Sequence, residues 1–568
     1  MTEENKDQNK KRSGVSRREF ITGTVGGVVV GAVVGAAAGS LGFPKTITQT
    51  LTQTTTQTSV STVQPGMPAK WDYSADVVVL GAGIAGLTSA IEAATQGAKV
   101  ILLEKDTQYV GGNFINQGGQ FTTYGPTSVQ KQLGTVTDPT LDNAANYYDV
   151  IAWGREPYED LDLVKLVVAH SNEAFEWTIN TGGNTYSTVG NGSWPKRVPV
   201  PPRPWVHNST NGGYGAAQAF KAKCDALGVT TMMGVRATGL VSNASGTVVG
   251  VEASTASQSS VYFSAAKGVI IATGGWAWNQ QMAQQYSSRV LGSNPYASRP
   301  TLTGDGITMG QAVGADLWGM EWTSLSSCCA KPLPTAFIPP RLPNQTHPAF
   351  PTMSGAVPAI WVDAHGNRFW DETDADSYKM HLIVGLQDQV AWMVFDSKAL
   401  PSTGATAINA YFNQDISTEV AAGYVTQANT ILDLANAIGI SPASNLVNTV
   451  NNYNTGAASK QDPLFGKPSA SVSPIVTPPF YATAIKKANL FTYGGLKTDT
   501  SARVIDIHNN PIPGLFAVGA TTGGYMTEWY PVGGITFPEL TTLGRIAGRN
   551  AALGVAQSPQ PWSSGTGT

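Results

Sequence analysis

Three glycines and one acidic residue have the types and the spacing needed to bind a dinucleotide. Gly81, Gly83 and Gly86 form a GxGxxG pattern, and Glu104 follows it further along the chain. In this pattern the first glycine permits a tight turn, the second lets a pyrophosphate approach the backbone, and the third lets helix and strand pack closely. A carboxylate placed like Glu104 accepts hydrogen bonds from the two hydroxyls of a ribose. Alone, GxGxxG often marks no more than a tight turn, so the flanking strands and helix decide whether it is a dinucleotide site.

The segment 76–105 has the order of elements that this chemistry requires. An apolar run at 77–80 is suited to a buried strand, and apolar residues then recur at helical spacing as far as Gly97. A second apolar run at 100–103 is suited to another buried strand. The helix start offers free N–H groups and a positive dipole end to phosphates. The strand–helix–strand unit therefore predicts a dinucleotide site.

The composition describes a large, weakly charged protein. The chain has 568 residues, enough for two large domains, and 13% of them are charged. Its net charge of −3 provides no basic surface, so we expect no nucleic-acid partner. Cys224, Cys328 and Cys329 are too few for a disulfide scaffold and lack haem or iron–sulfur spacing. No paired metal-ligand spacing is present, so no metal is expected, and any electron carrier must be a separate molecule.

The N-terminal part is typical of an export signal followed by a linker. Arg17 and Arg18 precede a stretch without charges, 20–43, that is rich in Gly and Ala. This pattern predicts a twin-arginine signal at residues 1–44. A plain membrane anchor is the alternative, because the stretch is long enough to cross a bilayer, although it is only weakly hydrophobic. Residues 45–70 are dominated by Thr and are predicted to be an extended linker.

Further glycine-rich motifs follow along the chain. Two pairs, Gly111-Gly112 and Gly118-Gly119, flank Asn113 in a loop whose backbone can run close to a flat ligand. A buried strand ends in Ala-Thr-Gly-Gly at 272–275, and a Gly-Asp-Gly turn at 304–306 opens a helix.

In this order, the motifs resemble the flavoproteins related to fumarate reductase, succinate dehydrogenase and 3-ketosteroid Δ1-dehydrogenase. The resemblance covers nearly everything from Asp76 to about Leu553. It implies FAD as the cofactor, held noncovalently because no histidine occupies the 111–119 loop. The later motifs that carry the resemblance are at 366–372, 480–482, 494–496, 513–519 and 543–548.

The resemblance also implies a fold and a set of cofactor-binding residues. The fold class is α/β: a Rossmann-like FAD-binding domain of the glutathione-reductase type, with an inserted α+β cap domain over the substrate. We place the FAD-binding domain at 71–309 and 481–556, the cap at 310–480, and a tail at 557–568. The implied FAD-binding residues are Gly81, Gly83, Ala85, Gly86, Glu104, Lys105, Gly111, Gly112, Asn113, Gly118, Gly119, Val235, Ala272, Thr273, Gly274, Asp305, Gly519, Gly534 and Thr536.

Three positions separate this chain from enzymes that act on small dicarboxylates. Fumarate reductases need cationic clamps for two carboxylates and an Arg that donates a proton. Here Phe491 or Thr492 stands where the family has a His, Pro531 where it has the clamping Arg, and Asp376 where it has the proton donor. The loss of all three argues against fumarate or succinate as the substrate.

The segment 529–534 instead resembles the Tyr-Pro-x-x-Gly element of ketosteroid dehydrogenases. By that resemblance, the Tyr530 hydroxyl and the Gly534 backbone N–H both donate to a substrate ketone. Two donors at one carbonyl acidify the adjacent C–H and stabilise a developing enolate, while hydride passes between the next carbon and flavin N5. The alternative is that Tyr530 is only a packed aromatic in a glycine-rich turn.

The acid–base residue has several candidates. Where the ketosteroid family has a Tyr after its GxRFxxE motif, this chain has Asp376, and Tyr378 follows closely. Tyr378 could substitute through a local shift, or Asp376 could act itself if burial raises its pKa. Alternatively, Asp371, Asp374 and Asp376 form a solvated acidic loop.

The sequence therefore predicts an exported FAD-dependent oxidoreductase that interconverts C–C and C=C bonds next to the carbonyl of an apolar, ring-shaped compound, steroid-like in the best case. We expect it in the periplasm or on the outer face of the cytoplasmic membrane. Its expected partners are the export machinery and a separate electron carrier, and its N-terminal segment is a candidate membrane tether. A reductase of an unsaturated carboxylate is the alternative enzyme. A flavin-dependent electron-relay protein is the non-catalytic alternative.

Overall fold

The described residues belong to one compact unit, 62–568, of the computed structural model. The export signal, most of the linker and the C-terminal tail lie outside the described residues, so those assignments stay predictions. No helix within the described ranges is long and apolar enough to cross a membrane. The structure describes residues 67–135, 138, 140–151, 160–191, 203–287, 290, 298–329, 359–374, 376–386, 389–400, 416–526 and 530–556.

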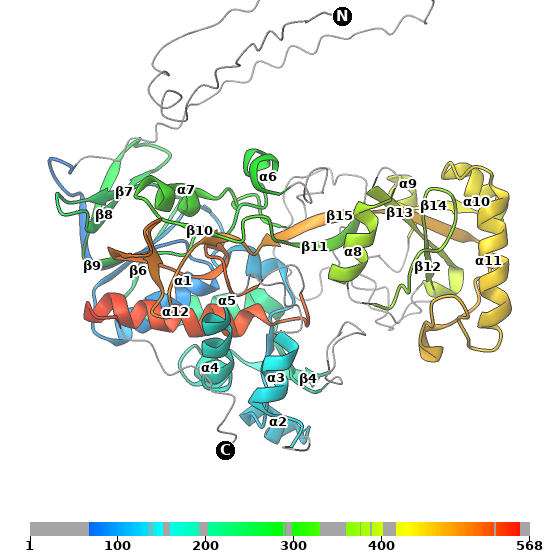
Figure 1. Ribbon diagram of the computed structural model, residues 1–568, viewed down its shortest axis with the longest axis horizontal. Coiled ribbons are helices and arrows are strands. Elements are labelled where there is room, and N and C mark those ends of the chain that lie inside the picture. The colour runs from blue at the N-terminus through cyan, green and yellow to red at the C-terminus, as the bar shows by residue number, and fades with distance from the viewer. Residues whose placement is uncertain are drawn as a thin grey trace, which may run out of the picture. The chain divides into compact units, whose positions relative to one another are not determined.

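A largely parallel sheet forms the centre of the first domain, in the order β17-β18-β9-β1-β2-β6. The β7–β8 hairpin, labelled in Figure 1, continues from β9. Strands β6, β2, β1, β9 and β18 pair in parallel, whereas β8 and β17 pair antiparallel with their neighbours. The strands are β1 (Tyr73–Leu80), β2 (Val100–Glu104), β6 (Thr230–Met233), β7 (Arg236–Ser242), β8 (Val248–Ser254), β9 (Val261–Ile271), β17 (Arg503–Ile505) and β18 (Pro511–Ala517).

Helices cover one face of this sheet and build the larger core. The other face packs on a second apolar core, which includes residues of the β7–β8 hairpin. The apolar residues 77–80 and 100–103 are therefore buried, as expected for parallel strands covered on both faces. Helix α12, red in Figure 1, packs beside α1 and α4. The helices of this domain are α1 (Ile84–Thr95), α2 (Ser128–Leu133), α3 (Ala144–Ile151), α4 (Leu161–Asn180), α5 (Gly212–Ala226), α6 (Gln280–Tyr286), α7 (Asp305–Ala312) and α12 (Thr536–Leu553). A small sheet beside them contains β3 (Gln120–Thr122), β4 (Tyr186–Gly190) and β5 (Val206–Ser209).

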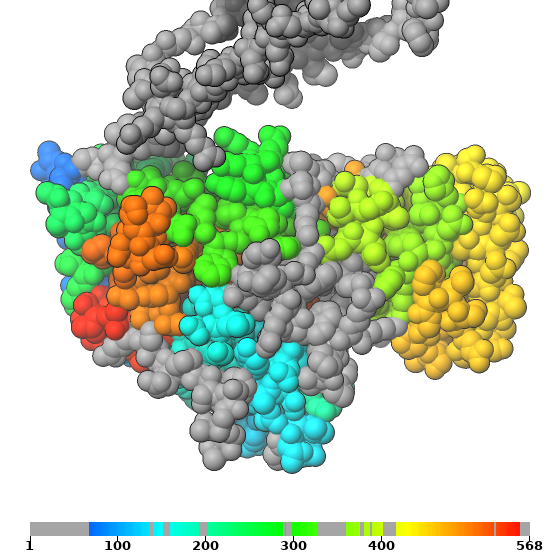
Figure 2. Space-filling model, viewed as in Figure 1, coloured from blue at the N-terminus to red at the C-terminus, as the bar shows by residue number. Residues whose placement is uncertain are grey.

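An antiparallel sheet, in the order β11-β15-β13-β12 with β14 also on β15, forms the centre of the cap. Separate apolar cores lie on its two faces, one of them under α10 and α11, which are at the surface in Figure 2. The junction that the sequence placed at 480 falls at the start of β15, which pairs within the cap sheet. The cap elements are β11 (Thr323–Cys329), β12 (Ala359–Val362), α8 (Asp376–Val384), β13 (Val390–Asp396), α9 (Ser417–Ala421), β14 (Thr426–Ala428), α10 (Ile431–Ala437), α11 (Ser444–Ala457) and β15 (Phe480–Thr492).

Two short strands, β10 (Leu317–Trp318) and β16 (Gly495–Leu496), pair at the base of the cap. The chain thus leaves the first domain before the cap and returns to it afterwards. The predicted α/β fold, a Rossmann-like domain with an inserted α+β cap, is confirmed.

The motif at 366–372 holds the cap together through buried charges. Arg368 donates two hydrogen bonds to Glu372, both 2.8 Å, and two to Asp462, at 2.8 and 2.9 Å. Lys467 lies 3.5 Å from Glu372 and donates to the carbonyl of Ala359 at 2.7 Å. Burial opposes the charge on Arg368, but the two carboxylates outweigh it and raise the pKa of Arg368. This cluster joins β12 to the segment after α11, so the motif's Arg and Glu are structural here.

Candidate active site

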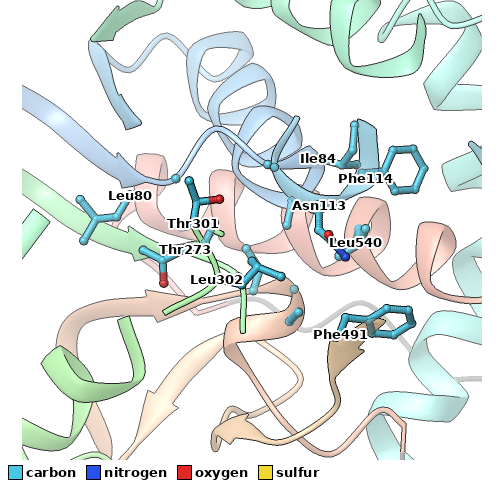
Figure 3. A pocket seen from close by; sticks show the side chains of 18 of the residues that line it. Leu80, Ile84, Asn113, Phe114, Thr273, Thr301, Leu302, Phe491 and Leu540 are labelled. Carbon is cyan, nitrogen blue, oxygen red and sulfur yellow. The ribbon is translucent and has the colours of Figure 1, made fainter. Parts of the chain in front are cut away.

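A cavity opens at the carboxyl ends of β1, β2 and β9, where open α/β sheets bind their ligands. Its walls come from both ends of the chain and from the end of cap strand β15. In Figure 3, Leu302 and Phe491 lie across the cavity from Ile84 and Phe114.

Most of the predicted cofactor residues line this cavity. These are Gly81, Gly83, Ala85, Glu104, Lys105, Gly111, Gly112, Asn113, Val235, Ala272, Thr273, Gly274, Asp305, Gly519 and Thr536. Gly86, Gly118, Gly119 and Gly534 are not part of its wall. Gly86 instead packs under the first turn, because a Cβ there would lie 1.9 Å from the carbonyl oxygen of Gly81.

The GxGxxG turn has the shape of a phosphate cradle. Gly81 has φ +95°, and a Cβ there would lie 2.4 Å from the oxygen of Ala272, so only glycine fits. Gly83 precedes the first residue of α1, and a Cβ there would meet nothing closer than that same oxygen at 4.0 Å. Because Gly83 lines the cavity, the space its missing side chain leaves is open to a ligand. These residues fit the diphosphate of FAD at the start of α1.

Glu104 ends β2 at the predicted ribose position. Its two carboxylate oxygens each accept a backbone hydrogen bond at 2.8 Å, from Ala82 and from Asp106. Burial raises the pKa of Glu104 despite these bonds. Each oxygen keeps further acceptor capacity towards the cavity it lines, so Glu104 fits a ribose diol.

Lys105, Arg236 and Asp305, here called the Asp305 cluster, lie at the same end of the cavity. Lys105 donates to Asp305 at 2.9 Å and to Thr303 at 2.7 Å, while Arg236 donates two bonds of 2.9 Å to Asp305. Burial would raise the pKa of Asp305, but the two cations outweigh it and lower that pKa to about 2. Both cations therefore share one carboxylate, which leaves the cluster with a net charge of +1. They are the only Lys or Arg side chains among the described residues that line the cavity.

Asn113 connects the cofactor loop to the cap. Its amide donates to the carbonyl of Leu490 in β15 at 2.9 Å and accepts from the N–H of Arg299 at 3.0 Å. Arg299 itself pairs with Asp106, next to Glu104. The glycine-rich loop therefore positions the end of β15 against the cavity.

Tyr530 and Gly534 lie together, but they bond to each other, whereas the sequence predicted that both would donate to a substrate ketone. The Gly534 N–H donates to the Tyr530 hydroxyl oxygen over 3.1 Å, instead of pointing separately at a ligand. Gly534 has φ +86°, and a Cβ there would lie 2.6 Å from the oxygen of Gln120, so this turn requires glycine. Thr122 fixes the turn by donating to the carbonyls of Gly533, at 2.5 Å, and Gly534, at 3.2 Å. Because its oxygen accepts from Gly534, the hydroxyl of Tyr530 can donate only in another direction.

Tyr530 lies behind the aromatic part of the cavity wall. Its ring packs edge-on against Phe491, with centroids 5.7 Å apart, and Phe491 packs in the same way against Tyr493 at 5.3 Å. Phe491 and Tyr493 line the cavity, and Tyr530 does not. Burial raises the pKa of Tyr530, so its hydroxyl is a neutral donor at physiological pH.

The predicted acid–base residues lie in the first turn of α8. The side chains of Asp376 and Tyr378 are outside the described residues, so their roles stay predictions. Asp371 and Asp374, however, are buried and not solvated, which corrects the acidic-loop alternative for them. Asp374 accepts from the indole N–H of Trp370 at 3.1 Å. Within the described residues no cluster of side chains could hold a metal ion.

Several lining residues were not found from the sequence. Glu539 and Leu540 follow Thr536 at helical spacing on α12, a signal that could have identified them once Thr536 was assigned. Phe491 was noted only at the position where the related reductases have a His. Other residues come from loops and from the cap, and no local pattern marks them: Phe114, Gln117, Thr301, Leu302, Tyr493, Ala520, Tyr525 and Met526.

A Rossmann-like sheet with a diphosphate cradle, a ribose acceptor and an inserted cap defines a dinucleotide-binding oxidoreductase. The chain belongs to the FAD binding domain family, which it matches over residues 76–537. It is 27% identical over 492 residues to the probable fumarate reductase Ifc3 of Shewanella frigidimarina (strain NCIMB 400), covering 86% of this chain and 77% of that protein. It is 28% identical over 506 residues to the urocanate reductase of Eggerthella lenta, covering 86% and 76%.

This chain is also similar to a solved structure of a dehydrogenase. The 3-ketosteroid Δ4-(5α)-dehydrogenase of Rhodococcus jostii RHA1, in complex with 4-androstene-3,17-dione, superposes with a TM-score of 0.67 and 26% identity, covering 86% of this chain and 100% of that one. The predicted FAD cofactor and the relation to both fumarate reductases and ketosteroid dehydrogenases are confirmed. The protein is an FAD-dependent oxidoreductase that acts on CH–CH groups or C=C bonds.

Proposed function

We propose that this protein is an exported enzyme that interconverts C–C and C=C bonds next to the carbonyl of an apolar, ring-shaped compound. One observation carries the proposal: the Tyr530 hydroxyl accepts from the Gly534 N–H at 3.1 Å, and the Tyr530 ring packs against Phe491 of the aromatic cavity wall. A neutral hydroxyl whose oxygen already accepts a hydrogen bond is a stronger donor to a substrate carbonyl.

The chemistry needs a hydride site, a polarised carbonyl and a proton-transfer group. Bound FAD supplies the hydride acceptor or donor. Tyr530 donates to the carbonyl oxygen, and the N–H of Gly534 stabilises the tyrosyl oxygen as negative charge develops. In desaturation, a proton leaves the carbon next to the carbonyl and a hydride leaves the following carbon, so that a C=C bond forms. Reduction is the reverse, with a proton delivered to the carbon next to the carbonyl. The proton-transfer group is proposed to come from the start of α8, from Asp376 or Tyr378.

The cavity wall supports an apolar substrate over a dicarboxylate. Phe491 and Tyr493 form its aromatic part, and Pro531 occupies the position where the resemblance to fumarate reductases implied an Arg. The lining cations of the described part, Lys105 and Arg236, both pair with Asp305 at the Glu104 end of the cavity. A second candidate function is reduction of an unsaturated carboxylate, and the likeness to proteins named fumarate and urocanate reductases favours it.

The decisive experiment is an anaerobic titration of the oxidised holoprotein, followed by its flavin absorbance. A 3-ketosteroid is added in one series and succinate in another. Bleaching by the ketosteroid alone supports the proposal, and bleaching by succinate alone overturns it in favour of the carboxylate function. If neither bleaches the flavin, the chemically reduced protein is mixed with a steroid enone or with fumarate. Reoxidation by the enone supports the proposed substrate class in the reductive direction. Reoxidation by fumarate alone, or by neither acceptor, overturns it.

Export is proposed from Arg17 and Arg18 and the uncharged stretch that follows them. The test compares the full chain with a variant in which both arginines are lysine, in a bacterial host with an active twin-arginine pathway. Cell fractionation should find flavin-loaded protein outside the cytoplasm only for the unmodified chain. Equal distribution of the two proteins would contradict the assignment.

A further inference from the structure

Glu539 is a buried carboxyl group on the wall of the cofactor cavity. Its side chain is 6% exposed and lines the cavity together with Thr536 and Leu540, which share its face of α12. Leu540 reaches the cavity from α12 in Figure 3. Among the described residues, none forms a hydrogen bond or an ion pair with the Glu539 carboxyl. A buried polar group without a partner is costly, so the ligand of this cavity is its natural partner.

The packing of two helices places Glu539 relative to the phosphate cradle. A Cβ on Gly544 would lie 3.0 Å from the oxygen of Ala85, and one on Gly548 would lie 2.3 Å from the oxygen of Ser89. The later residue of α12 thus contacts the later residue of α1, so the two helices run in the same direction. Glu539 comes five residues, or about 7 Å, before Gly544 along α12. Gly544 lies level with the first turn of α1, so Glu539 lies near the start of α1.

That position lies next to the diphosphate of a bound FAD. The start of α1 is where the cradle receives the phosphates, and Gly519 closes the gap between the two helices. A Cβ on Gly519 would lie 2.9 Å from the Cβ of Ala85 and 3.1 Å from the side chain of Leu540. A carboxylate at this place would face the negative diphosphate, whereas a carboxylic acid can donate a hydrogen bond to it.

We propose that Glu539 binds FAD as a neutral carboxylic acid, donating a hydrogen bond to an oxygen at the diphosphate–ribityl junction, so that FAD affinity falls when Glu539 ionises. The inference concerns the cofactor and is independent of the proposed substrate. It assigns Glu539 as a cofactor-binding residue and makes cofactor retention sensitive to alkaline pH.

The electrostatic surroundings agree with a neutral acid. Burial raises the pKa of Glu539 to about 8, and no charged group contributes to that shift. The charged side chains of the packed helices pair with one another: Arg549 lies 3.1 Å from Glu92, and Arg545 lies 2.7 Å from Glu173. The tyrosines nearest in sequence, Tyr525 and Tyr530, bond to the backbone at Ile535 and Gly534. The Asp305 cluster keeps one net positive charge, but it does not contribute to the pKa shift of Glu539. A bound diphosphate would disfavour the ionised form further.

The test measures the equilibrium dissociation of FAD from the full-length holoprotein by flavin fluorescence, between about pH 7 and about pH 9.5. If only the protonated form binds, a pKa of about 8 predicts a loss of about 30-fold in affinity over this range. Glu539→Gln keeps a neutral donor at every pH, so its affinity should change about threefold or less. Glu173→Gln removes a carboxylate whose pKa is about 2, and it should follow the wild-type curve.

Other titrating groups act equally in all three proteins, so the difference between the curves isolates Glu539. Parallel curves for wild type and Glu539→Gln would overturn the proposal. A wild-type affinity that rises with pH relative to Glu539→Gln would also overturn it, because it would mean that a carboxylate accepts from the cofactor.

A spectroscopic measurement covers the case in which Glu539→Gln does not fold. The infrared difference spectrum of wild type on FAD release at about pH 9 should show loss of the carbonyl band of one protonated carboxyl group. Absence of that band would refute the neutral acid independently of any variant.

Discussion

Replacing Tyr530 by Phe tests the catalytic proposal with a single lost oxygen atom. Loss of one donor to a developing oxyanion costs about 10²–10³ in turnover, or about 2.7–4 kcal/mol. The structure places the expected loss near the lower end, about 10², because the variant releases the Gly534 N–H, which now donates to the Tyr530 oxygen at 3.1 Å. Without the tyrosine oxygen, that N–H is available to donate to the substrate carbonyl and recovers part of the stabilisation.

The assay is an anaerobic stopped-flow measurement of the half-reaction with the substrate identified by titration. The rate constant at saturating substrate should fall about a hundredfold, while the FAD content of the purified protein stays unchanged. A smaller effect on substrate affinity is expected, because the hydrogen bond strengthens as charge develops in the transition state.

Tyr147→Phe is the matched control. Its hydroxyl is also buried, but it donates to the backbone carbonyl of Thr122 at 2.5 Å, in the strand that supports the Gly533-Gly534 turn. This variant should lose stability, by about 1 kcal/mol, and keep turnover within about threefold. If Tyr530→Phe also reacts within about threefold of wild type, the carbonyl-polarising role is refuted and Tyr530 is a packing residue.

Three further predictions concern the cofactor cradle, the cap and the buried acid. Gly83→Ala should fold normally, because its Cβ would meet nothing closer than 4.0 Å. Fluorescence titration should nevertheless show at least about tenfold weaker FAD binding, because the added methyl group occupies the phosphate position. Arg368→Met leaves two carboxylates buried and should cost about 3–5 kcal/mol in urea unfolding, against less than about 1 kcal/mol for Arg503→Met, whose ion pair is partly exposed. Equal costs would contradict the structural role of the cap cluster. Glu539→Gln should stabilise the FAD-free protein at pH 8. Because the pKa of Glu539 rises from 4.5 in the unfolded state to about 8 in the native state, the native state binds more protons between these pH values. The free energy of unfolding of wild type therefore falls by on the order of 4 kcal/mol as the pH rises from about 4.5 to about 8. Identical urea midpoints at pH 5 and pH 8 for both proteins would show that this burial cost is absent.

The cofactor half of the site was predictable because its signals are local. The turn from β1 to α1 and Glu104 at the end of β2 each follow an apolar run that must be a buried strand, and the Gly-Asp-Gly motif marks the start of α7. Gly83 and Glu104 meet the same ligand because carboxyl ends of parallel strands share one edge of a sheet. Such residues can be assigned from type and spacing alone.

The aromatic wall was not predictable in the same way. Phe491 reaches the cavity only because β15 runs through the cap sheet and is held at its end by Asn113, far away in sequence. The spacing of Tyr530 and Gly534 was visible, but their mutual hydrogen bond depends on the positive φ of Gly534, which is fixed by packing against Gln120. Asp374 looked solvated because acidic runs usually are, and its indole partner lies on a turn that the pattern did not specify.

The cofactor cavity is built from two distant parts of the sequence, and this determines when the protein can bind FAD. The cradle at Gly83 is made more than 400 residues before Gly519 and Glu539, which line the same cavity. Strand β18 must also pair with β9 before the central sheet is complete. FAD therefore meets a finished cavity only after both parts of the FAD-binding domain have been synthesised and folded. An enzyme loaded in this way and then moved across a membrane must be moved in the folded state, which is the kind of transport that the proposed twin-arginine signal would provide.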